Sequence, residues 1–512
     1  MCAEIFGHHS RFSSKSGQVG QEFEMSGLED TLRTVLSRRE SSGRLRRLTT
    51  SSPDKVDFSS NDYLSVSSNR EIQRDVLSRL ELRAAREEDG EPAGGILGSR
   101  GSRLLDGNSS FAESLERKIA TFHASPDALL FNSAYDANVG LLSCVPQPGD
   151  LILYDEDIHA SIHDGMRLSR ASKTLPFSHE SVIMDSNDAQ SARTAVADID
   201  NLLQQITSGE RGRDIKGGSK NVFICVEGVY SMDGSVLDLK KVVEAVKKYL
   251  PSRNGYIIVD EAHSTGVLGD QGRGLVCEYG LESQVFARVL GFGKAMGCSG
   301  GTYNAQMARS KLQSSFPNNC KVFDTWSLIR WNVSVDKSQN LGAVLCSSVT
   351  RSYLINYART LIYTTAPPFS SLVALESVFD YLASGRAEPS HQNLRFLVLH
   401  THQLLSGICS RLAPPARVLR VRKNISRSPI IPVFTSQPRS LASFCQQRGF
   451  MVRPIVAPTV QAGSERVRIC IHANNSVDHI EGLCRAIEQW TREHIGGKRG
   501  QGSAQEIHQA KL

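Results

Sequence analysis

Short apolar runs alternate with amphipathic stretches between about residues 110 and 300. Each run has the length of a buried strand, and in chain order they read "DALLFN", "DLILYD", "NVFICVEG", "GYIIVDEAH" and "RVLGFG". The stretch "DLKKVVEAVKKYLP" has Val242, Val243 and Val246 on one face and lysines on the other, which predicts a crossover helix. This alternation predicts an α/β fold with a mostly parallel sheet, in which a ligand lies beyond the carboxyl ends of the strands.

The beginning of the chain has a different pattern. Residues 1–26 lack an apolar period and are expected to be disordered. The next stretch, "LEDTLRTVLSRRESSGRLRRL", repeats leucine at helical spacing, which predicts an amphipathic helix that packs into the core. No apolar run approaches the roughly 18 to 20 residues of a membrane-spanning helix, so we expect no membrane span.

Charge and cysteine content narrow the function only slightly. The formal net charge of +6 comes from 59 basic and 53 acidic residues that are mostly intermixed, and it does not indicate a nucleic-acid-binding protein. The 11 cysteines include no C-x-x-C pair. We therefore expect reduced thiols in an intracellular compartment and no metal site.

Polar clusters stand where three of the apolar runs end, in "YDEDIHASIH", "EGVYSMDG" and "VDEAHSTG". In the third, Asp260 ends the run and His263 follows, while Lys294 lies 34 residues after Asp260 among the glycines of "VLGFGKAMGCSGG". A pyridine-aldehyde cofactor requires this combination, because the lysine forms its Schiff base and the buried carboxylate keeps the ring nitrogen protonated. The glycines allow the backbone to approach the cofactor closely.

Two other motifs match the same stretch less well. A phosphate-binding P-loop needs G-x-x-x-x-G-K-[ST], but Arg288 occupies the first glycine position and Ala295 follows the lysine. The segment "GCSGG" matches the nucleophile elbow G-x-S-x-G, with Ser299 as the nucleophile. No apolar strand directly precedes it, so we interpret this as a chance match.

Seven ordered motifs between about residues 27 and 490 together resemble one family. They are "FSSNDYL", "GSRGSRLLDGN", "HASIHDG", "EGVYSMDGS", "VDEAHSTGVLGDQGRG", "FGKAMG" and "LIYTTAPP". They are similar to those of the α-oxoamine synthases, which are fold-type I pyridoxal-phosphate (PLP) enzymes. The resemblance implies an N-terminal helix and lead-in segment at 27–90, a large PLP-binding domain at 91–365, a smaller C-terminal α+β domain at 366–490 and a flexible tail at 491–512.

The resemblance also implies a catalytic group of four residues. Lys294 matches the lysine that binds the cofactor, and Asp260 matches the partner of its ring nitrogen. His263 matches the group that bonds the phenolic oxygen, and His159 matches the histidine stacked on the ring.

Further cofactor contacts follow from the same resemblance. Ser231 matches a residue near the phenolic oxygen, Tyr135 an aromatic beside the cofactor, and Ala134 the adjacent backbone that holds the phosphate. Thr365 matches a phosphate ligand that a neighbouring subunit donates. The resemblance therefore implies a homodimer with shared active sites.

Family members condense an amino acid with an acyl-CoA and release carbon dioxide. Arg468 matches the arginine that binds the amino-acid carboxylate, a bidentate task suited to guanidinium, and Asn61 matches a substrate-side asparagine. Ser102 stands where glycine-specific members carry threonine, which leaves room for the methyl group of L-alanine. The segments "GVLGDQGRG" and "LIYTTAPP" are most similar to members that use pimeloyl-CoA in biotin biosynthesis. Another acyl-CoA or amino acid, as in aminolevulinate synthases or in secondary metabolism, stays open.

Two departures from the family pattern bear on activity. Gly291 stands where the family carries a threonine that binds the phosphate, so we expect cofactor binding to be weaker by about 1.5 to 3 kcal/mol. Residues 302–341 form an insertion that is expected to interrupt the sheet after the lysine. We hypothesise a translated intron or gene-model error there, with a surface loop as the alternative. An impaired paralogue acting as a partner subunit is therefore a second class of function.

The chain ends in Ala510, Lys511 and Leu512, a close variant of the S-K-L peroxisomal signal. This ending predicts recognition by a peroxisomal import receptor and a peroxisomal location. Without a working signal, the expected location is the cytoplasm.

Overall fold

The computed structural model describes residues 27–48, 50, 54–88, 96–184, 196–298, 341–425 and 427–495. The chain divides into two compact units between residues 53 and 54. The predictions for residues 1–26, for Ser299, for residues 302–340 of the insertion and for the C-terminal Ala510, Lys511 and Leu512 all lie outside the described residues.

A seven-stranded sheet with the order β2-β8-β7-β6-β5-β3-β4 forms the centre of the second unit. Its strands are β2 (Asp127–Phe131), β3 (Leu151–Asp155), β4 (Lys173–Phe177), β5 (Val222–Glu227), β6 (Gly255–Asp260), β7 (Ala287–Gly291) and β8 (Gly342–Cys346). The adjacent pairs are parallel except that β8 runs antiparallel to both β2 and β7. The five predicted strands are confirmed, whereas β4 and β8 were not predicted.

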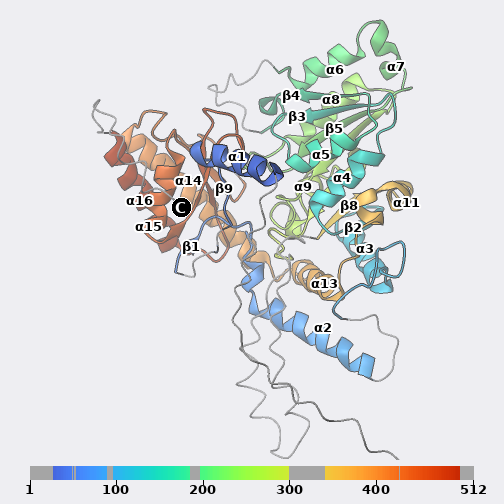
Figure 1. Cartoon of the computed structure of the whole chain (residues 1–512), viewed down its shortest axis with the longest axis horizontal. Helices are drawn as coiled ribbons and strands as arrows, with labels where there is room; N and C mark the ends of the chain where they lie inside the picture. Colours follow the sequence, from blue (N-terminus) through green and yellow to red (C-terminus); the bar gives the residue numbers. More distant parts are fainter. Residues whose placement is uncertain are drawn as a thin grey trace, which may run out of the picture. The chain divides into compact units, whose positions relative to one another are not determined.

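Alternate residues of each strand enter two separate hydrophobic clusters, so both faces of the sheet are covered. In β5, for example, Val222 and Ile224 belong to one cluster, while Phe223 and Cys225 belong to the other. Helices surround the sheet (Figure 1), and burial of both faces explains why the strands are continuously apolar. The helices of this part are α2 (Arg70–Glu88), α3 (Ser110–Phe122), α4 (Ala134–Cys144), α5 (Ala160–Leu168), α6 (Ile199–Thr207), α7 (Arg213–Lys216), α8 (Leu239–Tyr249), α9 (Leu275–Tyr279), α11 (Ser348–Tyr357), α12 (Arg359–Ile362) and α13 (Phe369–Ala383).

The C-terminal part has its own three-stranded antiparallel sheet, in the order β11-β12-β9. Its elements are α14 (Glu388–Leu412), β9 (Ile430–Phe434), α15 (Pro438–Gln447), β10 (Phe450–Met451), β11 (Arg453–Ile455), β12 (Arg466–Cys470) and α16 (Val477–Ile495). The short strand β1 (Val56–Asp57) pairs with β10, so the lead-in segment joins this part of the chain. Single-turn 3-10 helices lie at Val66–Ser68, His179–Ser181, Glu210–Gly212, Asp270–Gly272 and Glu282–Gln284.

The insertion does not interrupt the sheet, so that prediction is wrong. Strands β7 and β8, which flank it, pair directly from Arg288↔Leu345 to Gly291↔Gly342. Phe292 N–H also donates to the Leu341 carbonyl at 2.8 Å. Because these hydrogen bonds hold the two ends of the insertion side by side, the strand order is complete without it.

Two predictions concern the first and last helices of the described chain. Helix α1 (Gly27–Ser41), in the first unit, forms where a helix was predicted, and its packing into the core stays a prediction. Helix α16 continues to Ile495, with Trp490 and Thr491 fully buried, so residues 491–495 are helical where a flexible tail was predicted.

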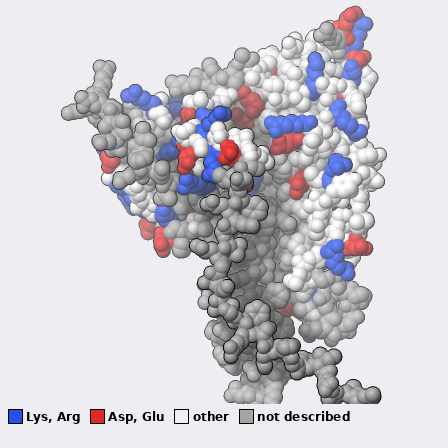
Figure 2. All heavy atoms as spheres, in the orientation of Figure 1, with Lys and Arg blue, Asp and Glu red and all other residues white. Residues whose placement is uncertain are grey.

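The described surface agrees with the mixed charge of the sequence. Figure 2 shows acidic and basic side chains interspersed on the face that it draws. Among the described helices, none combines the length and the apolar composition that a bilayer crossing needs.

Candidate active site

The carboxyl ends of β5 and β6 bring two carboxyl groups to the same edge of the sheet. Glu227 and Asp260 are the last residues of these strands and are direct neighbours in the register. Lys294 follows the adjacent strand β7 by three residues. The carboxyl ends of parallel strands lie at one edge of the sheet, so side chains at these ends come close together. The predicted pair Asp260 and Lys294 lies at this edge.

Asp260 is buried and held by two donors. Asn138 Nδ2, from α4, donates to Asp260 Oδ2 at 2.7 Å, and Ala262 N–H donates to Oδ1 at 2.9 Å. Asn138 Nδ2 also lies 2.9 Å from Ser161 Oγ. The site therefore holds a carboxyl group whose orientation is fixed by α4.

Burial lowers the pKa of Lys294, although the carboxyl groups of Asp260 and Glu227 act in the opposite direction. Among the described residues, the Lys294 amine has no hydrogen-bond partner. A lowered pKa makes the neutral, nucleophilic form of an amine more accessible. The lysine is therefore suited to attack a carbonyl carbon.

Two histidines flank this group, and burial lowers the pKa of both. His159 caps the N-terminus of α5, where its Nδ1 lies 2.8 Å from Ser161 Oγ. His263 Nδ1 lies 2.8 Å from the hydroxyl of Tyr63. The nearby Lys294 charge also opposes protonation of each ring, so both histidines are expected to be neutral near pH 7.

Arg468, in β12, reaches the site from the C-terminal sheet. Its Nε donates to the Ser231 carbonyl at 2.7 Å, and its Nη2 donates to Asn61 Oδ1 at 2.9 Å and to Tyr63 Oη at 3.2 Å. The structure therefore groups the predicted substrate residues Arg468 and Asn61 with Ser231. Nη1 has no hydrogen bond to another described residue, which leaves its N–H groups for a ligand.

Ala134 and Tyr135 begin helix α4, whose N-cap Ser133 accepts a hydrogen bond from Asp136 N–H. A Cβ added at Gly291 would lie 2.7 Å from Ala262 Cβ and 3.5 Å from Ala134 Cβ, so the backbone approaches this helix end closely. Helix N-termini attract anions through their free N–H groups. Tyr135 is 44% exposed and donates its hydroxyl to the Asp164 carboxylate.

Ser102 and Thr365 form a separate pair, joined by an isolated antiparallel bridge. Asn132 Nδ2 donates to the Thr365 carbonyl at 2.7 Å, and Asn132 precedes Ala134 by two residues. Among the described contacts, no hydrogen bond joins either residue to Lys294 or Arg468. The structure thus places this pair beside the start of α4 rather than within the lysine group.

Sequence reasoning missed three buried members of the site. Burial together with the Asp260 charge raises the pKa of Glu227 well above the usual range. Asn138 orients Asp260, and Tyr63 links His263 with Arg468. Tyr63 and Glu227 lie inside recognised motifs, but apolar periodicity does not show where a side chain points.

Comparison with known proteins decides the family. The model for "Aminotransferase class I and II" matches residues 53–316. The 8-amino-7-oxononanoate synthase of Emericella nidulans is 42% identical over 463 residues, which cover 90% of this chain and 96% of that protein. The chain belongs to the aminotransferase class I and II family. Within it, the chain is an α-oxoamine synthase and a PLP-dependent acyltransferase, as its motifs predicted.

Other relatives of this family match at greater distance. The aminoacyl transferase sphA of Aspergillus fumigatus is 31% identical, and the match covers 89% of this chain and 86% of that protein. Among solved structures, serine palmitoyltransferase from S. paucimobilis has a TM-score of 0.66 at 20% identity, covering 92% of this chain and 99% of that chain. The 8-amino-7-oxononanoate synthase of Francisella tularensis has a TM-score of 0.57 at 23% identity, covering 86% and 98%. These structural matches confirm the fold-type I architecture.

The described residues fit the PLP of this family. The uncommitted Lys294 amine suits the aldehyde, the buried Asp260 carboxylate suits the ring nitrogen, and the N-terminus of α4 suits the phosphate. Gly291 contributes no hydroxyl there, so the expected weakening of phosphate binding stays a prediction.

Proposed function

We propose that this chain condenses L-alanine with pimeloyl-CoA and releases carbon dioxide, giving 8-amino-7-oxononanoate and CoA. The observation that carries the proposal is the 42% identity to the Emericella nidulans synthase over 96% of its length. The grouping of Lys294, Asp260, His159 and His263 supports an active enzyme over an impaired paralogue, because a partner subunit has no need of an amine whose pKa is lowered beside a buried carboxyl group.

Arg468 binds the carboxylate of alanine in this proposal. Three hydrogen bonds fix its Nε and Nη2, so the free Nη1 is oriented before the substrate arrives. Preorganisation of this kind limits the entropy lost on binding. Asn61 Oδ1, which accepts a hydrogen bond from Arg468 Nη2, helps to orient the guanidinium toward the substrate.

Lys294 moves the proton at alanine Cα, since its lowered pKa provides a neutral amine that can accept it. PLP, when bound, supplies the electron sink that takes up the electron pair left at Cα. Asp260 holds the proton of the ring nitrogen, with its own carboxylate fixed by Asn138 and Ala262. In the overall reaction, a bond forms between alanine Cα and the acyl carbon, the thioester bond breaks and the carboxylate leaves as carbon dioxide.

A different amino acid or acyl-CoA is the second candidate, and the 31% identity to the aminoacyl transferase sphA supports it. The deciding measurement is the visible spectrum of the PLP-loaded protein, titrated separately with L-alanine, glycine and L-serine. Pimeloyl-CoA is then added and free thiol is recorded. A spectral change and thiol release with L-alanine alone are expected. Release with another amino acid would favour the second candidate, and no response to any of the three would favour the impaired paralogue.

We further propose that the active unit is a homodimer in which Thr365 serves the partner's site. Thr365 is exposed. Tyr363, two residues before it, is 71% exposed, and Leu105, which lies three residues after the bridge partner Ser102, is 76% exposed. A second copy of the chain would cover such side chains. This proposal agrees with the implied sharing of active sites.

Subunit mixing tests where Thr365 acts. Lys294→Ala and Thr365→Ala homodimers are each expected to be inactive or strongly impaired. If Thr365 serves the partner, a mixed dimer has one fully native site, and activity returns on mixing. If Thr365 serves its own chain, mixing restores nothing, because each Lys294-bearing site still lacks its threonine.

We also propose a peroxisomal location, supported by the ending Ala510, Lys511 and Leu512. A fluorescent protein fused before the last ten residues is expected to enter peroxisomes. The same fusion without the final three residues is expected to stay in the cytoplasm. Equal distribution of the two fusions would refute the proposal.

A further inference from the structure

The turn between β5 and α8, residues 228–237, carries Ser231 and has a tightly defined backbone. Tyr230 N–H donates to the Ser235 carbonyl at 3.0 Å, and Gly234 N–H donates to the Tyr230 carbonyl at 2.9 Å. Gly234 has φ 69°, and a Cβ there would lie 2.0 Å from the Ile430 carbonyl of β9. The turn therefore lies directly against the C-terminal sheet that carries Arg468.

A buried network of charged and polar side chains connects the turn to the seven-stranded sheet. His179 Nδ1 lies 2.9 Å from Asp155 Oδ2 at the end of β3, and His179 Nε2 lies 2.9 Å from Ser235 Oγ in the turn. The Tyr230 hydroxyl donates to Asp155 Oδ2 at 2.7 Å. Two side chains of the turn are thus tied to β3 and to the 3-10 helix at 179–181.

Asp233 ties the same turn to the C-terminal part. Its Oδ2 lies 2.6 Å from Arg422 Nη2 and 3.8 Å from Arg466 Nη1. Its Oδ1 accepts from Ser235 Oγ at 2.8 Å. Asp233 is buried, so removing its charge would leave Arg422 and Arg466 without that partner in a low-dielectric environment.

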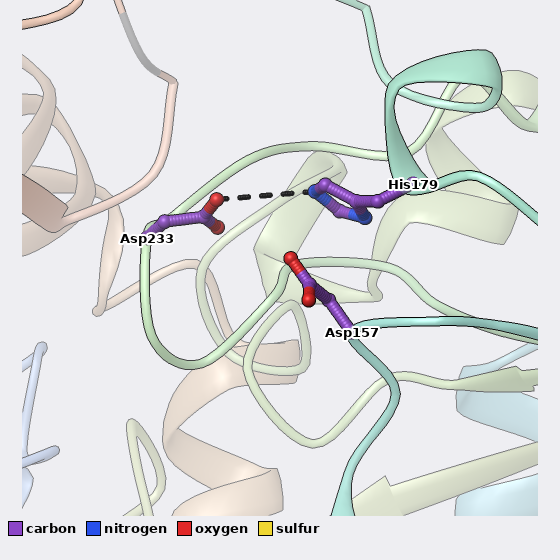
Figure 3. A group of neighbouring side chains, drawn as sticks. All are labelled: Asp157, His179 and Asp233. Carbon is purple, nitrogen blue, oxygen red and sulfur yellow. Dashed lines mark ion pairs between the residues drawn. The ribbon is translucent and has the colours of Figure 1, made fainter. Parts of the chain in front are cut away.

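Three residues of this network, Asp157, His179 and Asp233, have ligand atoms within 4.8 Å of one another and could in principle hold a metal ion (Figure 3). Their hydrogen bonds argue otherwise. A metal-binding histidine needs a free ring nitrogen, whereas both nitrogens of His179 already have partners. The arginines also compensate the Asp233 charge, so the geometry favours an ion-pair network.

We propose that Asp233 and Arg422 are positioning residues for amino-acid binding: they hold the turn whose Ser231 carbonyl orients Arg468. The link is direct, because Arg468 Nε donates to that carbonyl at 2.7 Å. Displacement of the turn removes one of the supports of the guanidinium while leaving Lys294 and Asp260 in place. The inference rests on the proposed role of Arg468 in binding the substrate carboxylate.

Asp233→Asn, Arg422→Met and Arg422→Lys test the inference in the full-length, PLP-loaded protein. Asp380→Asn is the matched control, because Asp380 pairs with Arg79 and Lys118 away from the turn. The visible spectrum gives the affinity for L-alanine, glycine and L-serine, and fluorescence gives the affinity for PLP. Mass spectrometry measures hydrogen exchange at the backbone amides of residues 228–237. Circular dichroism and urea unfolding show which variants are folded, so the PLP and amino-acid affinities are compared between folded proteins, and Arg422→Lys tests whether a retained positive charge restores binding.

Asp233→Asn and Arg422→Met are expected to weaken amino-acid binding roughly 5- to 50-fold, the range of coupling within one hydrogen-bond network. Faster exchange at 228–237 should accompany this loss, with PLP affinity falling less than amino-acid affinity and Arg422→Lys close to wild type. Equal loss of amino-acid and PLP affinity, or faster exchange without loss of amino-acid affinity, would overturn the inference. Failure of the wild-type protein to bind any of the three amino acids would refute the proposed function and this inference with it.

Discussion

Substitution of His179 by glutamine should change how the stability of the protein depends on pH. Burial by itself would lower the pKa of His179, but the Asp155 carboxylate raises it to about 10, against an ordinary value of 6.5. The folded state therefore keeps a proton that the unfolded state loses above pH 6.5. This contribution to stability is fully present below pH 6.5 and is lost as pH rises through about 10.

The structure sets the size of the effect. His179 and Asp155 side chains are 3% and 0% exposed, so solvent screens their interaction little. The difference between a pKa of 6.5 and one of about 10 corresponds to at most about 5 kcal/mol, at about 1.4 kcal/mol for each pH unit. His179→Gln removes the titrating group but keeps hydrogen-bonding atoms.

Urea unfolding of the wild type and of His179→Gln at pH 7.0, 8.0 and 9.0 measures this contribution. The stability difference between the two proteins should shrink by about 1.4 kcal/mol per pH unit. His123→Gln is the control, because burial lowers the pKa of His123 to about 3, so this residue is neutral in both states throughout the range. A His179→Gln difference that stays constant between pH 7 and 9 would refute the charged state of His179.

Three further substitutions test the site. Lys294→Ala should lower kcat by at least roughly 10²-fold because the proton acceptor is lost; turnover near the wild-type rate would exclude this role. Arg468→Lys should raise the KM for the amino acid about 10- to 100-fold, because the bonds to Ser231 and Asn61 and the free Nη1 are lost, while an unchanged KM with a lower kcat would contradict carboxylate binding. Gly291→Ala should lower the free energy of unfolding by about 1 to 3 kcal/mol, because the added Cβ would lie 2.7 Å from the Cβ of Ala262. An unfolding curve equal to that of the wild type would show that the backbone adjusts freely.

Local patterns in the sequence were sufficient for much of the fold and for the centre of the site. Five buried strands and the helix α8 appear where apolar runs and valine spacing predicted them. Asp260 ends strand β6, and Lys294 closely follows the parallel strand β7. The two residues meet because the carboxyl ends of parallel strands lie at the same edge of the sheet. Periodicity and motif spacing depend on near neighbours in the chain, which explains why these features could be read directly.

Contacts between distant segments required the tertiary structure. The antiparallel strand β8 rejoins β7 across the insertion, because strand pairing depends on partners that no local pattern identifies. The same reason applies to the site: Arg468 is oriented by Asn61 and Tyr63, about 400 residues away in the sequence. The sequence by itself determined which strand ends carry the reactive residues. Only the tertiary structure decided which side chains from distant segments hold those residues in position.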